Sequence, residues 1–535
     1  MKVQVSRRDF LKAGVATSAA IGSSKWVHAA APKPGTRRFN VLHILADQHQ
    51  AAQIGYEGNH QVITPHLDNL AAQGTRFERA YTQCPICTPS RISMLSGQYC
   101  HNHGYYGLAG PTPVFNLPSY LSHFREHGYR TAAIGKIHTP DVPRNWLDGH
   151  CDTLEEVFTY FPRGLSIEYS GYLSELGLLD KDDSFRLPEF PHRRQYDARP
   201  SNIPYEHSVE GWTVKRAIQF LEGVGDQPFC MQVSFPHPHE AWTPAKQFWD
   251  MYPEDLALPP TLYADDSQRP PQFKADVAML RRTEWLFEPK TFEAGCRRIW
   301  RGYLGCITQV DFAVGQLMDF LKRSGRLDDT IVVYGSDHGG YMGTFGCPEK
   351  VPGICSEAVC RVPMVWRVPT VTPPGTVCRE LAQNVDIAPT ITSLCNLPPM
   401  QTVDGKNISG LLEGGSEAVH EVVVTEFAWS KSLRWGPWEF VHFQREMFNG
   451  KDVGELYNLE NDPEEKVNLY YSPAHQEIVH ECRRRLCEWL ISSTRFVTTA
   501  PAPPGTIWSL TAADGKESNQ AGIMERVKRR QLNYI

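Results

Sequence analysis

The sequence predicts an α/β fold: a large, mainly parallel sheet sandwiched by helices, with a smaller C-terminal α+β subdomain built on an antiparallel sheet. Helical and strand-like segments alternate over most of the chain, which is typical of parallel sheets. Several short strands are almost continuously apolar, as expected when helices cover both faces of a sheet. After about Pro398 the alternation gives way to neighbouring strands and a final helix.

The expected elements follow one another in a regular order. Apolar strands are expected at residues 41–46, 131–134, 229–235 and 330–334. Helices are expected at residues 65–73, 118–127, 206–222 and 299–323. The first two helices begin with proline and are followed by glycine, as helix ends often are. In the C-terminal part we expect strands at 422–427 and 439–443 and a helix at 474–490.

Two long segments, 141–204 and 253–289, are rich in proline and charge and lack a clear period. Long irregular insertions are usually lids or binding loops, with disorder as the alternative, so we expect these segments to shape a substrate site. The expected organisation is an N-terminal segment at 1–31, a large domain at 37–397, the C-terminal subdomain at 398–495 and a tail at 496–535.

The composition narrows the class of protein. The chain is 41% hydrophobic and 21% charged and has no apolar run long enough to span a bilayer, so we expect no stable membrane insertion. The net charge of -6, from 54 basic and 60 acidic residues, argues against a nucleic-acid partner. The 14 cysteines are too dilute for a disulfide scaffold, and the sequence does not assign pairs.

The N-terminus has the pattern of a twin-arginine export signal. Arg7 and Arg8 precede a mildly apolar stretch at 13–21 and small residues at 29–31. We therefore expect the twin-arginine translocase as a partner and a periplasmic or secreted location, with a disordered basic tail as the alternative. This route carries folded proteins, so a side chain can be modified in the cytoplasm before export.

Polar residues follow four of the predicted strands. They are Asp47 and Gln48, Lys136 and His138, His237 and His239, and Asp337 and His338. Ligands of open α/β sheets bind outside the carboxyl ends of the strands, so we expect these residues to converge on one pocket.

Four of these residues make a candidate metal site. Asp47 and Asp337 offer carboxylates, Gln48 an amide oxygen and His338 an imidazole. Hard oxygen ligands favour Ca²⁺ or Mg²⁺. An aspartate at a strand end can instead cap the next helix.

Cys87-Thr88-Pro89-Ser90-Arg91, followed by Ile92-Ser93-Met94-Leu95-Ser96-Gly97, resembles the signature of the type I, formylglycine-dependent sulfatases of the alkaline-phosphatase-like superfamily. The resemblance implies that Cys87 is oxidised to formylglycine by a formylglycine-generating or sulfatase-maturating enzyme. It also implies that the hydrated aldehyde is the nucleophile. Pro89 suits the first turn of a helix, whose positive end favours a sulfate. The alternative is a redox pair with Cys84, but the surrounding sequence lacks a thioredoxin-like unit.

The segment from Glu455 to Pro463 extends the resemblance to the C-terminal subdomain. In this family Ca²⁺ is held by side chains at positions that match Asp47, Gln48, Asp337 and His338, together with an oxygen of the formylglycine. Gln48 departs from the commonest pattern, which has a second aspartate. Glutamine at this position is also familiar in choline sulfatases and in phosphonate monoester hydrolases, so hydrolysis of a phosphonate monoester or a phosphodiester is the alternative activity.

The resemblance assigns roles to five further residues. Lys136 and His138 fit the family's Gly-Lys-x-His element, where the lysine lies near the sulfate oxygens and the histidine accepts a proton when the sulfate is released. His239, rather than His237, matches the family's histidine after a strand and a proline. Lys350 matches a lysine that contacts the substrate. The resemblance therefore implies that Lys136, His239 and Lys350 bind the substrate. His239 and Lys350 are also expected to assist departure of the alcohol.

The remaining role falls to the arginine of the signature. The guanidinium of Arg91 has a fixed geometry that suits anchoring the diol and the metal-bound oxygens.

The predicted function is that of a sulfuric-ester hydrolase, cleaving an O-sulfate on a carbohydrate or another small alcohol, with Asp337 as the base. A noncatalytic glycan-binding protein or a thiol-redox protein is the alternative of another class. The mass of the peptide around Cys87 distinguishes these classes, because an aldehyde differs in mass from a thiol or a disulfide.

Overall fold

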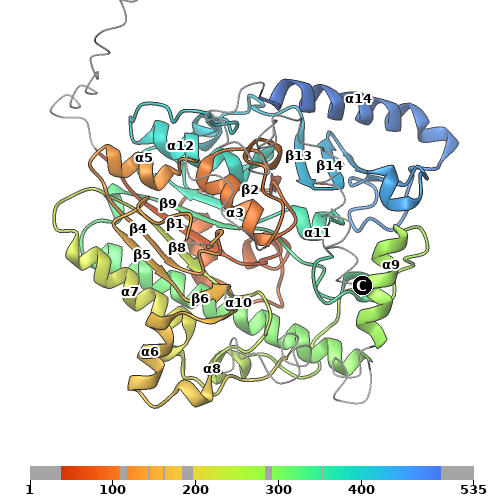
Figure 1. The fold of residues 1–535 in the computed structure, drawn as a ribbon. Helices are drawn as coiled ribbons and strands as arrows, with labels where there is room; N and C mark the ends of the chain where they lie inside the picture. Colours follow the sequence, from red (N-terminus) through yellow and green to blue (C-terminus); the bar gives the residue numbers. More distant parts are fainter. Residues whose placement is uncertain are drawn as a thin grey trace, which may run out of the picture. The chain divides into compact units, whose positions relative to one another are not determined.

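The computed structural model has strand β1 (Asn40–Ala46) inside an eight-stranded sheet (Figure 1). The strand order is β11-β2-β10-β9-β1-β8-β4-β5. The other strands are β2 (Thr75–Phe77), β4 (Arg130–Gly135), β5 (Thr153–Glu156), β8 (Phe229–Phe235), β9 (Thr330–Ser336), β10 (Met364–Arg367) and β11 (Thr376–Cys378). Only β10 runs antiparallel to its neighbours, β9 and β2. The prediction of a mainly parallel sheet is confirmed.

The structure describes residues 38–108, 117–141, 145–160, 163–182, 197–282, 292–351 and 353–495. The predicted export signal at 1–31 and the predicted tail at 496–535 lie outside these residues. The chain divides into two compact units, Met1–Arg38 and Phe39–Ile535, and the fold described here belongs to the second. Among the described residues, no helix has both the length and the apolar character required to cross a membrane.

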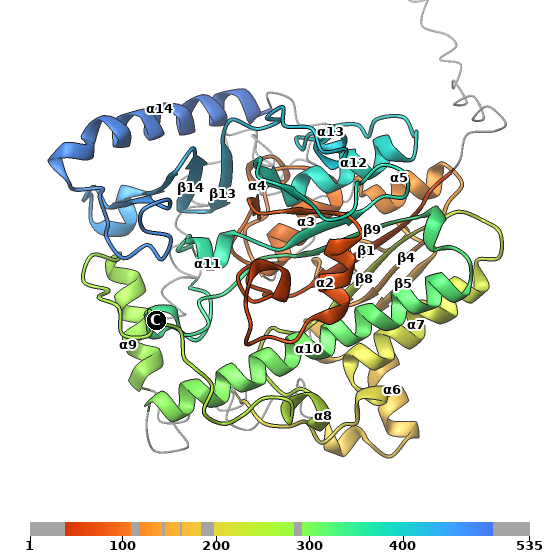
Figure 2. The ribbon, with the colours of Figure 1, turned by 180° about the vertical axis from the view of Figure 1, so that it is seen from behind.

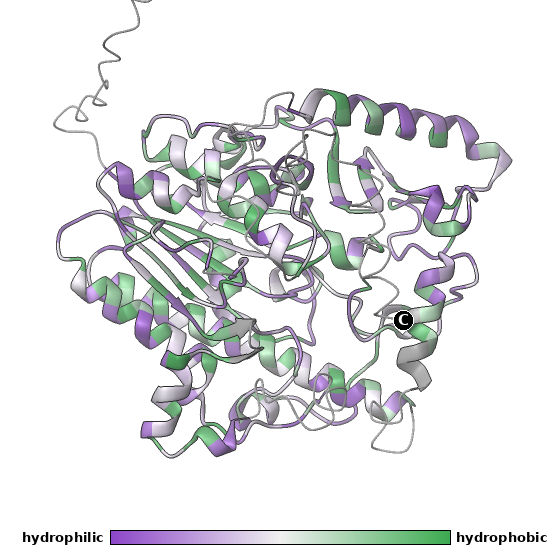
Figure 3. Cartoon of the chain, in the orientation of Figure 1, coloured by the Kyte–Doolittle hydropathy of each residue, from purple (hydrophilic) through white to green (hydrophobic). Residues whose placement is uncertain are grey.

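Helices cover both faces of the main sheet (Figures 1 and 2). One face packs against α3 (Cys87–Ser96), α5 (Tyr120–Glu126) and α12 (Ile387–Leu394). The other packs against α2 (Pro65–Ala72), α7 (Val209–Gly223) and α10 (Phe292–Arg323). In β1, Val41 and Leu45 contact the first layer, and Leu42 and Ile44 contact the second. Alternate residues of a strand point to opposite faces, which explains why both faces of β1 are apolar apart from Asn40 and His43. Figure 3 shows hydrophobic residues along the strands of the main sheet.

The two insertions are more regular than the sequence predicts. The first contains β5, the hairpin of β6 (Phe158–Tyr160) and β7 (Arg163–Leu165), and α6 (Ile167–Glu175). The second contains α9 (Pro271–Arg282). Strands of three or four residues give too short a pattern to detect. In α9, however, Pro271 starts the helix and Phe273 and Val277 are buried four residues apart, a signal that the sequence offers.

The C-terminal part contains the predicted antiparallel sheet. Its strands pair in sequence order: β13 (Val423–Phe427), β14 (Ser430–Trp435), β15 (Trp438–Phe443) and β16 (Gly454–Asn458). Helix α14 (Gln476–Ser493) buries Val479, Cys482, Leu486 and Trp489 against this sheet. Their spacing of three and four residues places them on one face of the helix. The predicted α+β subdomain is confirmed.

The remaining α-helices and strands among the described residues are short. They are β3 (Ala80–Tyr81), β12 (Ala382–Gln383), α4 (Cys100–His103), α8 (Lys246–Trp249), α11 (Glu357–Cys360) and α13 (Ser409–Leu412).

Candidate active site

Four neighbouring strands, β9, β1, β8 and β4, end at the same edge of the sheet. Ala46 pairs with Ser336 on one side and with Phe235 on the other, and Gly135 pairs with Ser234. The residues that follow these strands are therefore brought to one place, although they are nearly 300 positions apart in the chain. Gly135 has a φ of +108°, and a Cβ there would lie 2.0 Å from the Ser234 carbonyl oxygen, so the close approach of β4 to β8 requires glycine.

Cys87 is the first residue of α3 and is buried at the centre of this edge. Its Sγ lies 3.2 Å from Nε2 of His338 and 3.8 Å from Oδ1 of Asp47. Burial and the charge of Asp47 raise the pKa of Cys87 to about 12. The unmodified thiol is therefore protonated at neutral pH, which is the wrong state for a reactive redox cysteine.

Asp47, Cys87, Asp337 and His338 form a candidate metal centre. Each offers one ligand atom, all four atoms lie within 4.8 Å of one another, and all four residues are buried. Two carboxylates and an imidazole fit a divalent cation, and a positive charge would compensate the buried carboxylates. The sequence predicted all four residues as metal ligands.

Arg91 connects the strand ends. Its Nε donates to Asp337 at 2.7 Å and its Nη2 to Asp47 at 2.9 Å. Its Nη1 donates to the Lys136 carbonyl at 2.5 Å and to the Ser234 hydroxyl at 2.9 Å. Arg91 is 1% exposed and lies one helical turn after Cys87, on the same face of α3. The guanidinium thus holds both metal-site carboxylates in place.

Lys136 and His138 follow β4. The Nζ of Lys136 lies 2.7 Å from Oδ2 of Asp47. Burial alone would raise the pKa of Asp47, but Lys136, together with nearby charged groups such as Arg91, holds that pKa well below its ordinary value. Burial and the charge of Lys136 lower the pKa of His138 well below its usual range. His138 is therefore neutral at neutral pH and can accept a proton.

Gln48 joins the metal cluster to Lys350. Its backbone N–H donates to Oδ1 of Asp337 at 3.1 Å, and its Oε1 accepts from the Nζ of Lys350 at 2.7 Å. Gln48 has a φ of +63°, a left-handed conformation that is uncommon for residues other than glycine. Such conformations concentrate at functional sites.

The two histidines after β8 face different surroundings. His237 is turned toward α7, where its Nδ1 lies 3.0 Å from Glu210. His239 lies with its Nε2 3.3 Å from the Nζ of Lys350. The structure therefore brings His239, the residue that the sequence favoured, to the candidate site. Burial and the charges of Lys136 and Lys350 lower the pKa of His239 well below its ordinary value.

Sequence reasoning missed three carboxylates beside these groups. Glu240 follows His239, Glu349 precedes Lys350, and Glu156 accepts from the backbone N–H groups of Ile137 and His138. Glu240 and Glu349 lie in loops without a periodic pattern, so the only signal was their position beside a predicted site residue.

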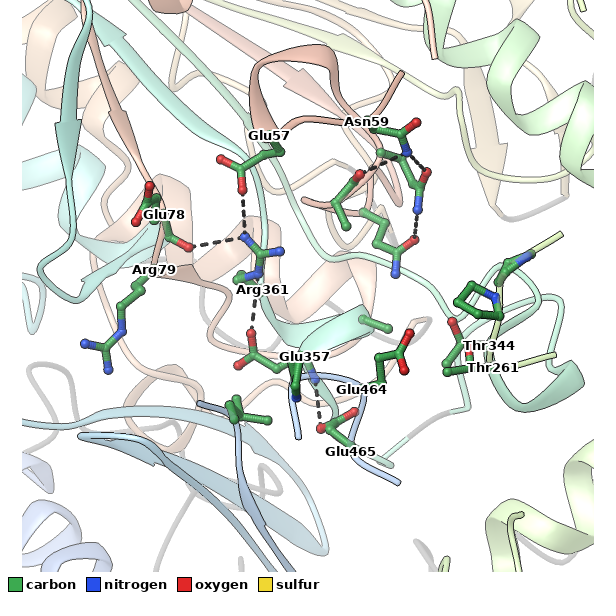
Figure 4. Close-up of a pocket in the computed structure, with 18 of the residues that line it drawn as sticks. Glu57, Asn59, Glu78, Arg79, Thr261, Thr344, Glu357, Arg361, Glu464 and Glu465 are labelled. Atoms are coloured by element: carbon green, nitrogen blue, oxygen red, sulfur yellow. Dashed lines mark hydrogen bonds and ion pairs between the residues drawn. The ribbon is translucent and has the colours of Figure 1, made fainter. Parts of the chain in front are cut away.

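A separate cavity of about 830 Å³ lies between the main sheet and the C-terminal sheet (Figure 4). Its lining does not include the residues of the candidate active site. Four of its charged side chains pair with one another: Arg361 contacts Glu57 at 3.2 Å and Glu357 at 3.4 Å, and Arg434 contacts Glu357 at 3.1 Å. These charges are thus compensated within the protein.

Comparison with known proteins identifies the family. The sulfatase family profile matches residues 39–397, and a profile described as the C-terminal part of N-sulphoglucosamine sulphohydrolase matches residues 354–491. The chain belongs to the sulfatase family. It is an enzyme of that class, a sulfuric-ester hydrolase, and members of the family use a metal ion.

Two curated relatives cover most of the chain. An arylsulfatase of Clostridium perfringens is 26% identical over 473 residues, spanning 84% of this chain and 94% of the relative. A choline-sulfatase of Rhizobium meliloti is 28% identical over 460 residues, spanning 82% and 83%.

Solved structures show the same fold. A phosphonate monoester hydrolase from Silicibacter pomeroyi superposes with a TM-score of 0.72 at 21% identity, covering 87% of this chain and 97% of that one. A protein solved in complex with its substrate D-glucosamine-2-N,6-O-disulfate superposes with a TM-score of 0.67 at 19% identity, covering 85% and 98%.

Proposed function

We propose that this sulfatase cleaves the O-sulfate of a carbohydrate or another small alcohol through a formylglycine derived from Cys87 and a bound Ca²⁺, with Mg²⁺ as the alternative ion. One observation carries the proposal. Cys87, within its signature sequence, begins a helix at the edge where four strands end, and its Sγ lies within 4 Å of both Asp47 and His338.

The residues that would hold the cation are Asp47, Gln48, Asp337, His338 and the modified residue 87. The cation would supply a positive charge that favours deprotonation of the attacking hydroxyl and binds the sulfate oxygens. Asp337 would act as the base, and Arg91 would fix its carboxylate through the 2.7 Å hydrogen bond from Nε. The hydrated formylglycine would supply one hydroxyl for attack on sulfur and a second whose proton is lost when sulfate is released.

Lys136 and His138, which follow β4, would act on the sulfate group. Lys136 carries a positive charge at the edge of the site, held beside Asp47 at 2.7 Å, and would stabilise charge on the sulfate oxygens. His138, which is neutral, would accept the proton from the remaining hydroxyl and so release sulfate.

His239 and Lys350 would assist departure of the alcohol. Their side chains lie together, 3.3 Å apart, on the loops after β8 and β9. An alkoxide is a poor leaving group, and a nearby ammonium or proton donor stabilises it as the bond to sulfur breaks. Sugars and other aliphatic alcohols require this help more than phenols do.

The names of two relatives support a carbohydrate substrate. An N-acetylglucosamine-6-O-sulfatase of Bacteroides thetaiotaomicron is 24% identical over 514 residues. An ulvan-active sulfatase of Formosa agariphila is 28% identical over 461 residues. We further propose maturation by a formylglycine-generating or sulfatase-maturating enzyme and export to the periplasm by the twin-arginine translocase, on the pattern around Arg7 and Arg8.

A phosphonate monoester or phosphodiester hydrolase is the second candidate. Gln48 at the metal site and the fold shared with phosphonate monoester hydrolases support it. Lys136 and His138 favour the sulfatase, since phosphonate hydrolases generally have neutral residues in that element. A side-by-side assay of aryl sulfate and phosphodiester substrates separates the two, and a much higher rate on the phosphodiester would reverse the choice.

The nucleophile is tested with protein co-expressed with a maturation enzyme. We expect the peptide containing residue 87 to carry the mass of the aldehyde and the enzyme to release sulfate from one of a panel of sulfated mono- and oligosaccharides. Cys87→Ser should allow attack but block release, leaving a sulfate ester at position 87. Full turnover by that variant would contradict the proposed chemistry.

A further inference from the structure

Two buried carboxylates flank the groups proposed to act on the departing alcohol. Glu240 is adjacent in sequence to His239, and Glu349 is adjacent to Lys350. Their side chains are 1% and 12% exposed in their respective ion pairs. Burying a carboxylate costs free energy unless hydrogen bonds or opposite charges compensate it. The groups that contact each carboxylate therefore indicate which hydrogen-bond donor or positive charge it holds in place.

The backbone carbonyl and the carboxylate of Glu240 together favour one tautomer of His239. The imidazole Nδ1 lies 2.8 Å from the backbone carbonyl oxygen, which accepts its N–H, and 3.2 Å from the carboxylate, whose negative charge favours a proton on the same nitrogen. Nε2 faces the ammonium of Lys350, which can only donate. The proton of the neutral ring therefore resides on Nδ1, and the lone pair of Nε2 points toward Lys350.

Glu349 completes the environment of Lys350. The Nζ lies 2.7 Å from Oε1 of Gln48, 2.9 Å from Oε1 of Glu349 and 3.3 Å from Nε2 of His239. An ammonium has three N–H donors: the oxygens of Gln48 and Glu349 hold two of them, and the third, on the longest of the three contacts, points to His239 and is the one that can turn to the departing oxygen. Glu349 and Gln48 thus hold the ammonium of Lys350 in one orientation beside His239.

A metal ion is the other conventional explanation for such a cluster. His239, Glu240 and Glu349 offer ligand atoms that lie within 4.8 Å of one another. The ammonium of Lys350, however, already contacts both Glu349 and His239 and supplies the compensating positive charge. Lys350 therefore already supplies the positive charge that a metal ion would otherwise bring to this cluster.

We propose that Glu240 and Glu349 are positioning residues, which hold His239 and Lys350 in the orientation that assists departure of the alcohol. This inference rests on the proposed function, because it assigns the two carboxylates to one step of that reaction. Neither carboxylate is required to touch the substrate.

Dependence on the leaving group provides the test. Expressed with a maturation enzyme, the wild type, E240Q and E349Q are assayed on aryl sulfates of increasing leaving-group pKa and on an alkyl sulfate. We expect each variant to lose about 10- to 100-fold in kcat on the alkyl sulfate but less than about threefold on 4-nitrophenyl sulfate, because a good leaving group needs little assistance. The ratio of the two rates is independent of the fraction of folded enzyme.

The matched control is E210Q. Glu210 forms the same kind of contact with His237, at 3.0 Å, but that pair faces α7. E210Q should therefore leave the ratio of the two rates at its wild-type value even if it destabilises the fold. Equal losses of E240Q or E349Q on all leaving groups, a change in KM alone, or the same leaving-group dependence in E210Q would overturn the proposal. Failure of the wild type to release sulfate from any substrate would instead refute the proposed function.

Discussion

The candidate active site has two halves that are built differently. The nucleophile half consists of Asp47, Cys87, Arg91, Asp337 and His338, each at most 1% exposed. Its residues lie at strand ends or at the start of α3, so the pairing of the sheet sets their positions. The leaving-group half consists of His239, Glu240, Glu349 and Lys350, which lie on loops. Its geometry depends on contacts among the four side chains and with Gln48.

The difference has a physical consequence. In the nucleophile half, the carboxylates are 0% exposed, so removing one of their counter-charges leaves buried negative charge less well compensated. In the leaving-group half, hydrogen bonds hold the loops together, and more than one kind of side chain can form such bonds. We therefore expect the first half to govern stability and metal binding, and the second to govern which alcohols leave.

The largest expected effect follows from removal of the Arg91 guanidinium. Arg91→Met leaves Asp47 and Asp337 without their 2.9 Å and 2.7 Å ion pairs and should lower the free energy of unfolding by about 3–5 kcal/mol, measured by urea denaturation with chelator present. Arg484 is the control, because its pairs with Glu481 and Glu488 lie on the exposed face of α14. Arg484→Met should cost less than about 1 kcal/mol. Equal losses would remove the distinction between buried and exposed pairs.

Metal removal should affect only the nucleophile half. A chelator should lower the thermal midpoint of the wild type, since an ion present at 100 times its Kd stabilises the folded state by about 2.7 kcal/mol. Asp337→Asn should abolish most of this response, because it removes one of the two carboxylates of the metal cluster. Lys350→Met should retain it. A chelator response that survives in Asp337→Asn would place the ion elsewhere.

A smaller effect concerns the end of β4, which supplies Lys136 and His138. Burial raises the pKa of Glu156 to about 7 in the folded state, above its ordinary value of 4.5. Between these two pKa values the folded state binds more protons than the unfolded state. The stabilisation that protonated Glu156 contributes to the fold is therefore fully present below about pH 4.5 and is lost as the pH rises through about 7. From pH 5 to pH 8 the free energy of unfolding of the wild type should fall by about 2 kcal/mol relative to that of Glu156→Gln, after allowance for partial solvent screening.

Glu156→Gln retains an oxygen that can accept from the N–H groups of Ile137 and His138. Urea denaturation at a series of pH values measures the difference between the two proteins. Parallel stability curves from pH 5 to 8 would show that Glu156 does not titrate in this range.

Much of the fold could be predicted because local patterns carry it. The apolar run before Asp47 identifies a strand covered on both faces, and the spacing of Val479, Cys482, Leu486 and Trp489 predicts a helix with one buried face. The short strands β5 to β7 could not be predicted, because three or four residues do not establish a period. The existence of β5 depends on its pairing with β4, which is a tertiary contact.

Of the site, the sequence by itself determined the kinds of groups: a signature cysteine at the start of a helix, and carboxylates, imidazoles and lysines after strands. Tertiary structure alone decided which of them meet and how each is oriented. His239 and His237 are two residues apart, and only the packing of Glu210 and Lys350 around them separates their roles. Side-chain orientation, tautomer and charge are set by neighbours that are distant in sequence, and local patterns carry no information about those neighbours.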